Sequence, residues 1–175
     1  MPTGIKFVWG AAVAMTLMCV VGSIVALGVA QNLKPDGGQT ANRIADFTLP
    51  AGYREEYVVN IGGYLAVSYY TGDGHSHIFL IQGPPDLRID RDSIWDMLPA
   101  YDRTTRLTVV ETRSIVVRDQ DTPLTISEGA NSDGVAYREL AVPFQGKGGP
   151  ALLVMSEPLT RWDRATVFTF VASIR

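Results

Sequence analysis

The sequence predicts an α+β fold, in which an antiparallel β-sheet carries helices and follows one amino-terminal membrane helix. Three observations lead to this prediction. Residues 7–30 form an uncharged run near the start of the chain. Short alternating or apolar runs, separated by Gly, Pro and Asp-Gly turns, fill most of residues 46–175. The chain then closes with apolar residues at helical spacing.

The composition excludes several classes of protein. The 175 residues are 46% hydrophobic and 19% charged, with a net charge of −3. The chain is therefore too apolar to be disordered, and it lacks the basic excess expected of a nucleic-acid binder. Its single cysteine, Cys19, excludes an intrachain disulfide and a cysteine-rich metal cluster. The composition does not identify a reaction that the protein could catalyse, and we expect no cofactor.

The uncharged run is long enough to cross a bilayer. A helix of 24 residues is about 36 Å long, whereas the hydrocarbon core needs about 20 residues. We therefore expect a short tail at residues 1–6 and a signal anchor at residues 7–30. The flanking charges do not decide the orientation, but so short a tail usually stays in the cytoplasm. The expected location is the cell membrane, with a single pass and an extracytoplasmic carboxyl-terminal domain.

Two kinds of processing would change this prediction. A signal peptidase could use Gly28 and Ala30, small residues placed just before Gln31, although a cleavable apolar core usually spans about 7–15 residues. Lipid attachment at Cys19 is disfavoured, because Met18 stands where a lipidated cysteine needs a small residue. An uncleaved anchor is the interpretation that fits the length of the run.

Small residues recur every four positions in the run. Gly22, Ala26 and Ala30 share one helical face, and Gly10 and Ala14 repeat the spacing. Such a face lets two membrane helices approach closely. Other membrane-protein subunits are therefore expected partners, beside the lipid membrane itself. The alternative is that glycine and alanine are simply common in membrane helices.

Residues 31–45 are expected to form a flexible linker. They are polar, contain Pro35-Asp-Gly-Gly38 and show no periodicity. A linker of this length would keep the domain that follows, residues 46–175, close to the membrane.

Eight short runs with β character are expected to form the antiparallel sheet of that domain. Asp73-Gly74 predicts a hairpin turn, and the segment 77–81 is apolar at nearly every position, as in a strand covered on both faces. In a third run, Leu124 and Ile126 are expected to face inward. The expected strands are residues 46–49, 53–61, 64–71, 76–82, 106–118, 122–128, 135–144 and 150–156.

Two helices are expected to accompany the sheet. Residues 90–101 place Ile94, Trp95 and Leu98 on one helical side, which predicts a short middle helix. At the carboxyl end, Thr160 and Asp163 match a capping box. The helix that follows would pack on the sheet through a face that comprises Val167, Phe170, Val171 and Ile174.

Five short stretches carry a resemblance to known proteins. They are Phe47-Thr-Leu-Pro50-x-Gly52-Tyr53, His77-Ile-Phe-Leu-Ile-Gln82, Gly149-Pro-Ala-Leu-Leu153, Trp162-x-Arg164 and Phe170-Val-Ala-Ser-Ile174. Residues 46–175 thereby resemble uncharacterised bacterial membrane-anchored proteins with an extracytoplasmic domain of the PsbP/Mog1-like α+β type. The resemblance implies an accessory or interaction module rather than an enzyme, and it transfers no functional residue.

The most conspicuous constellation of chemical groups is Asp73-Gly-His75-Ser-His77. Two histidines two residues apart on an extended chain point to the same face. Together with Asp73 they could offer three ligands to zinc, copper or nickel. The alternative is a polar hairpin tip with two partly exposed histidines.

Other motifs favour structural roles. Asp86, Asp90, Asp92 and Asp96 suit helix capping and solvation rather than a catalytic acid pair. Residues 145–149, Gln-Gly-Lys-Gly-Gly, lack the spacing of a phosphate-binding loop and predict a hairpin loop. The chain contains no G-x-S-x-G motif.

The sequence therefore favours a non-enzymatic, membrane-anchored accessory or interaction module, such as a small subunit of a membrane protein complex. The alternative is a membrane-tethered sensor or carrier domain that binds a small ligand or a metal ion through His75 and His77. A third hypothesis, a hydrolase whose residues are dispersed along the chain, requires a deep polar pocket.

Overall fold

The computed structural model describes residues 36–86, residue 89 and residues 105–175. The expected tail at 1–6, the anchor at 7–30 with its small-residue face, and the middle helix at 90–101 lie outside these residues. No helix of the described part is both long and apolar enough to cross a bilayer. Residues 35–175 form one compact unit, which is mostly β.

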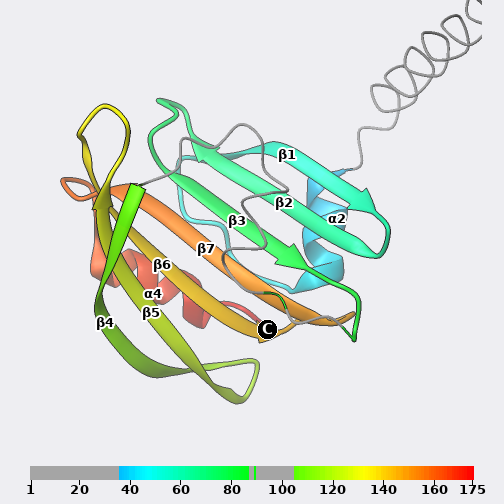
Figure 1. Ribbon diagram of the computed structural model, residues 1–175. Helices are drawn as coiled ribbons and strands as arrows, with labels where there is room; N and C mark the ends of the chain where they lie inside the picture. The colour runs from blue at the N-terminus through cyan, green and yellow to red at the C-terminus, as the bar shows by residue number, and fades with distance from the viewer. Residues whose placement is uncertain (1–35, 87–88, 90–104) are drawn as a thin grey trace, which may run out of the picture. The chain divides into compact units, whose positions relative to one another are not determined.

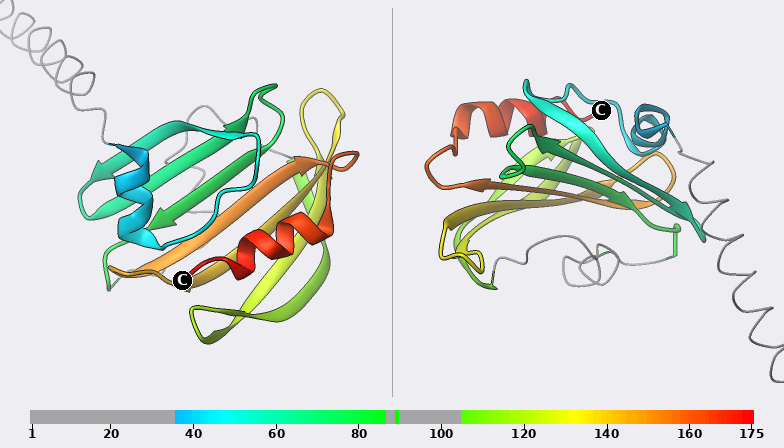
Figure 2. Two further views of the ribbon diagram at one scale, coloured as in Figure 1. Left: turned by 180° about the vertical axis from the view of Figure 1, so that it is seen from behind. Right: turned by 90° about the horizontal axis from the view of Figure 1, so that it is seen from above.

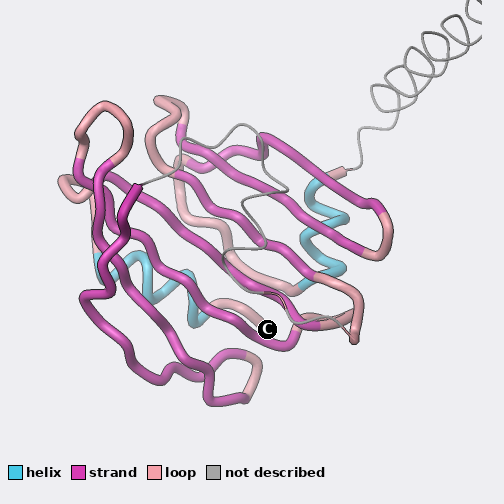
Figure 3. The backbone as a smooth tube through the Cα atoms, viewed as in Figure 1, coloured by secondary structure: helices cyan, strands magenta, loops and turns pink. Residues whose placement is uncertain are grey.

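One seven-stranded antiparallel sheet makes up the body of the unit (Figure 1). The strand order is β1-β2-β3-β7-β6-β5-β4, so two meanders meet where β3 pairs with β7. Figure 3 shows the strands in magenta and the two short helices in cyan. The elements are β1 (Tyr53–Ile61), β2 (Tyr64–Thr71), β3 (His77–Gln82), β4 (Thr105–Val117), β5 (Gln120–Ala130), β6 (Ala136–Gln145), β7 (Pro150–Pro158), α2 (Gly37–Ile44) and α4 (Arg164–Ala172).

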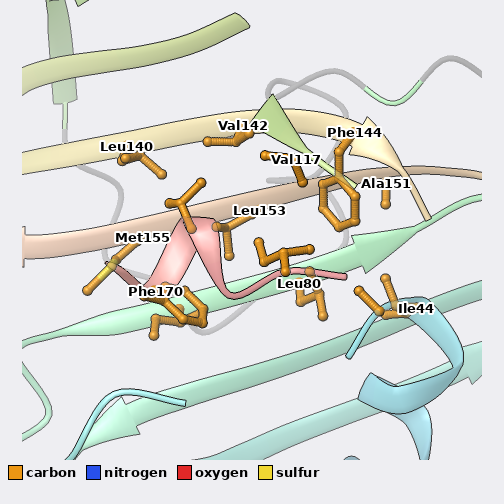
Figure 4. Packing of buried hydrophobic residues seen from close by; sticks show 14 of the residues in the cluster. Ile44, Leu80, Val117, Leu140, Val142, Phe144, Ala151, Leu153, Met155 and Phe170 are labelled. Carbon is orange, nitrogen blue, oxygen red and sulfur yellow. The ribbon is translucent and has the colours of Figure 1, made fainter. Parts of the chain in front are cut away.

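Both described helices cover the same face of the sheet (Figure 2). The main core lies between that face and the helices, and Figure 4 shows its side chains converging from β3, β6, β7, α2 and α4. Alternation along each strand supplies this core, because every second side chain points to one face. Its fully buried members include Ile44, Ile78, Leu80, Leu124, Ile126, Leu140, Leu153, Met155, Val167 and Val171.

The central strand β3 is apolar on both faces, as the sequence predicts. Ile78 and Leu80 belong to the core beneath the helices. Phe79 and Ile81 form a second cluster with residues of β7 on the opposite face. All four side chains are buried, so both faces of β3 are covered and continuous apolar character is stable there.

The expected linker at 31–45 is wrong for its described part, because residues 37–44 form helix α2. Asp36 caps this helix, and its Oδ1 accepts hydrogen bonds from the amides of Gly38 and Gln39 at 2.9 and 3.3 Å. Ala41 and Ile44 are buried in the main core. The helix escapes detection because Gly-Gly opens it and because eight residues give too few apolar positions for a period.

The expected strand at 46–49 is also absent, and a loop takes its place. Asp46 instead exchanges two backbone hydrogen bonds with Arg175, at 3.0 and 2.8 Å. The described part of the compact unit therefore begins ten residues earlier than expected, at Asp36 rather than at Asp46, and Asp46 is tied to the carboxyl end of the unit.

The carboxyl-terminal helix is confirmed, but its cap differs from the prediction. Asp163, not Thr160, is the N-cap of α4, and its Oδ1 accepts a hydrogen bond from the amide of Ala165 at 3.0 Å. The predicted face does pack on the sheet, because Val167, Phe170, Val171 and Ile174 are all buried.

Candidate functional site

Buried polar side chains gather at one end of the sheet, beside the β2–β3 turn. Ser76, Glu139, Ser156 and Glu157 are all buried there, although polar groups rarely lie inside a domain. Strand pairing brings them together, since His77 lies opposite Ser156 and Ser156 lies opposite Glu139. We call this region the polar end. It comprises Tyr53, Asp73, His75, Ser76, His77, Glu139, Ser156, Glu157 and Arg161.

The predicted hairpin turn at the polar end is confirmed, and Asp73 organises it. Gly74 has a φ of 73°, a left-handed conformation that favours glycine. The Oδ1 atom of Asp73 accepts hydrogen bonds from the Thr71 hydroxyl at 2.6 Å and from the His75 amide at 3.1 Å. Arg161 forms an ion pair with the same carboxylate. The Thr71 hydroxyl, the His75 amide and Arg161 hold the pKa of Asp73 below its usual range.

The two histidines of the turn have different surroundings. His75 is exposed. His77 stacks on Phe79, with ring centroids 6.0 Å apart, and its Nε2 lies 3.0 Å from the Gly74 carbonyl oxygen. No group of three or more His, Cys, Asp or Glu side chains among the described residues is arranged to hold a metal ion. The hypothesis of a metal site at Asp73, His75 and His77 gains no support from this arrangement, because Asp73 is engaged by Arg161.

A second contact joins the start of β1 to the end of β7. The Tyr53 hydroxyl donates a hydrogen bond to Glu157 Oε1 at 2.6 Å. Burial raises the pKa of Tyr53 well above its usual value, and the Glu157 carboxylate adds to this shift. Burial also raises the pKa of Glu157, although the Tyr53 hydrogen bond opposes that change. The fold therefore favours the protonated form of Tyr53, and ionising Glu157 costs free energy in the folded state.

An acid beside the polar end and an imidazole and a hydroxyl within it lie on three separate strands. Glu56 Oε2 of β1 lies 3.7 Å from His77 Nδ1 of β3, and Ser156 of β7 is the in-register neighbour of His77. A hydrolase needs the serine hydroxyl within hydrogen-bond reach of the imidazole and open to substrate. Ser156 is 0% exposed, and its Oγ has no hydrogen-bond partner among the described residues. These three side chains do not assemble an activated nucleophile in this structure.

The glycine loop at residues 145–149 is a hairpin loop between β6 and β7, as predicted. Its Lys147 Nζ donates hydrogen bonds to the Asn42 carbonyl at 2.8 Å and to Asp46 Oδ1 at 2.7 Å. The Gly148 amide donates to Gln82 Oε1 at 2.9 Å. The loop therefore fastens α2 to the sheet. Of the four predicted capping carboxylates, Asp90, Asp92 and Asp96 lie outside the described residues.

A groove of about 510 Å³ runs between the segment 48–51 and α4 and is open to solvent. Its volume lies within the range of small-molecule sites, but no charged side chain lines it. The lining residues are Thr48, Leu49, Pro50, Ala51, Ala165, Thr166, Thr169, Phe170 and Ser173.

Exposed apolar side chains lie on the two strands at the edges of the sheet. On β4 these include Val109 and Val116, which are 57% and 59% exposed. On β1, Tyr57 and Ile61 are exposed in the same way. In the described part of the chain no strand pairs with the outer side of β1 or β4, and edge strands in general offer backbone groups for pairing. The sequence predicts the strands, but their places at the edges follow only from the pairing order.

No protein-family model matches the chain, and no curated protein is significantly similar to it. The resemblance to the PsbP/Mog1-like type stays a prediction.

Proposed function

We propose that this chain is a membrane-anchored interaction module without enzymatic activity of its own, and that it serves as a small subunit of a membrane protein complex. The observation that carries the proposal is the short stretch of chain between the uncharged run and the folded unit. Only residues 31–36 separate Ala30 from the first residue of α2, Gly37. Six extended residues reach at most about 20 Å. An anchored run would therefore hold the domain at the bilayer surface.

The surface of the domain supports a role in binding other proteins. The exposed valines of β4 and the exposed Tyr57 and Ile61 of β1 place apolar area beside sheet edges with which no described strand pairs. Strand addition to such an edge is a common mode of protein recognition. A domain held close to a membrane meets partners in the same membrane at high effective concentration, so modest edge contacts suffice.

The polar end supports the absence of catalysis. Ser156 is buried. Asp73 forms an ion pair with Arg161, and Glu157 accepts a hydrogen bond from Tyr53. These contacts join strand ends and turns to one another, which is a structural role.

The first test asks whether the run anchors the chain. A version with a carboxyl-terminal tag is expressed beside a matched variant, Val20→Asp/Val21→Asp, which places two charges in the middle of the run. Each charge costs about 2.5–3.5 kcal/mol at the centre of a membrane helix. We expect the unaltered chain to stay with the membranes at high salt and alkaline pH, and the variant to be released. Release of both would refute the anchor.

The second test asks whether the chain belongs to a complex. Native membranes are extracted with a mild detergent, and the tagged chain is recovered at low and at moderate salt. We expect other membrane proteins in fixed stoichiometry with the tagged chain. A protein of 19.0 kDa recovered alone at both salt concentrations would contradict the proposal.

A further inference from the structure

The outer edge of β4 has the features of a strand that accepts another strand. It is the longest strand of the sheet, at 13 residues, and no described strand pairs with its outer side. Its sequence contains neither proline nor lysine, two residues by which edge strands commonly prevent pairing. Val109 and Val116 leave apolar side chains in solvent along this edge.

Two opposite charges stand two residues apart on β4 and share one face. Glu111 lies opposite Ile126 and Arg113 lies opposite Leu124, so both point toward the side of the sheet that α4 covers. Glu111 accepts two hydrogen bonds from Arg164 of α4, at 2.8 and 2.7 Å. The guanidinium of Arg113 lies 4.4 Å from the centre of the Phe168 ring. Helix α4 therefore fixes both side chains, yet 29% of Glu111 and 45% of Arg113 stay exposed.

We propose that β4 pairs antiparallel with β4 of a second copy of this chain, in the register centred on Thr112. In that register each Glu111 lies opposite Arg113 of the second copy, so two pairs of opposite charges form across the seam. A centre one residue earlier would place Glu111 opposite Glu111, and a centre one residue later would place Arg113 opposite Arg113. Like charges directly opposite each other disfavour both of those registers.

This register is defined by the regular part of β4, from Glu111 to Val117, where each residue has one partner on β5. The pairing of β4 with β5 is irregular between Val109 and Glu111, which marks a bulge at Val110. A bulge resists extended, undirected pairing of an edge. Since a two-fold arrangement uses the same edge on both copies, the assembly closes as a dimer.

This inference names one partner for the proposed interaction function, and a cysteine cross-link tests it separately. The full chain is purified in detergent with Cys19→Ser, and Thr112→Cys is compared with the matched control Ser114→Cys. At the centre of the register, two copies of residue 112 come within about 4.4–6.8 Å between Cα atoms, the range a disulfide needs. Two copies of residue 114 would be about 14 Å apart.

We expect the disulfide-linked dimer to form at least tenfold faster with Thr112→Cys than with Ser114→Cys. Equal rates, a faster reaction of Ser114→Cys, or no cross-link in either variant would each overturn the proposal. None of these results bears on the release of the Val20→Asp/Val21→Asp variant from membranes, so a failure here differs from a failure of the proposed function.

Charge reversal in the Thr112→Cys background provides an independent test. Arg113→Glu alone places two carboxylates opposite each other, and Glu111→Arg alone places two guanidinium groups opposite each other. We expect each variant to lose the cross-link by itself and an equimolar mixture to recover it as a heterodimer. Arg113→Glu keeps the Arg164–Glu111 contact, so its loss of cross-linking is informative even if Glu111→Arg does not fold. Unchanged cross-linking of Arg113→Glu would refute the register.

Discussion

Two buried serines on the same sheet face should respond to alanine substitution with opposite signs. Ser156 is fully enclosed and its hydroxyl has no hydrogen-bond partner within the part of the chain that the structure describes, whereas the Ser68 hydroxyl donates to Glu56 Oε2 at 3.3 Å. An unpaired buried hydroxyl carries a desolvation cost of about 1–3 kcal/mol. Ser156→Ala removes that cost and loses only the packing of one oxygen atom. We expect the free energy of unfolding to rise by about 1 kcal/mol.

The matched variant Ser68→Ala removes a donor that is in use. It leaves the Glu56 carboxylate with one hydrogen bond fewer, so we expect the free energy of unfolding to fall by about 0.5–1.5 kcal/mol. In a unit of this size the melting temperature should rise by about 3–5 °C for Ser156→Ala and fall by a similar amount for Ser68→Ala.

The assay is urea unfolding of the purified full chain in detergent, followed by circular dichroism at 25 °C. The midpoint should move while the slope stays constant, because neither substitution changes the area exposed on unfolding. A loss of 1 kcal/mol or more for Ser156→Ala would show that its hydroxyl has a partner, and the account of the polar end would then be wrong.

Four further predictions concern the turns, the polar end and the metal hypothesis. Gly149→Ala should lower the melting temperature, because a Cβ atom there would overlap the Gly83 carbonyl oxygen, whereas Gly72→Ala meets no atom within 4 Å and should be neutral. Asp73→Asn should destabilise the chain at pH 7, and the difference should shrink as the pH falls below about 4, because a lowered folded-state pKa gives stability that protonation removes. Glu157→Gln should abolish the loss of stability that the unaltered chain shows as the pH rises above about 4.5, since a raised folded-state pKa makes the ionised form costly in the fold. An excess of zinc should leave the melting temperature unchanged, and an increase that His75→Ala removes would instead favour the metal hypothesis.

Local patterns predict most strands of this domain, because alternation is visible within a few residues. Leu124 and Ile126 are buried as expected, and the apolar segment 77–81 lies at the centre of the sheet. The last helix is predicted for the same reason, through Val167 and Phe170 and their neighbours at helical spacing. Helix α2 is missed because its signal consists of one capping aspartate and two apolar residues.

The candidate site is harder to predict from the sequence, because residues that are far apart in the chain form it. The turn at Asp73 is predicted locally, but its partner Arg161 follows 88 residues later. The neighbourhood of His77 and Ser156 likewise depends on the register between β3 and β7. No spacing rule connects such residues, so only the assembled sheet shows which polar groups share its end.

The junction of the two meanders has a consequence for how the chain folds. Five of the six strand pairings join consecutive strands of one meander, and the sixth joins β3 to β7 across about half of the domain's length. Closing that long loop costs conformational entropy before any of its contacts form. We expect the strands within each meander to pair first, and the pairing of β3 with β7 to limit the folding rate. Substitutions along β3 or β7, such as Leu80→Ala or Leu153→Ala, should then slow folding, whereas equally destabilising changes in β1 or β4 should mainly speed unfolding.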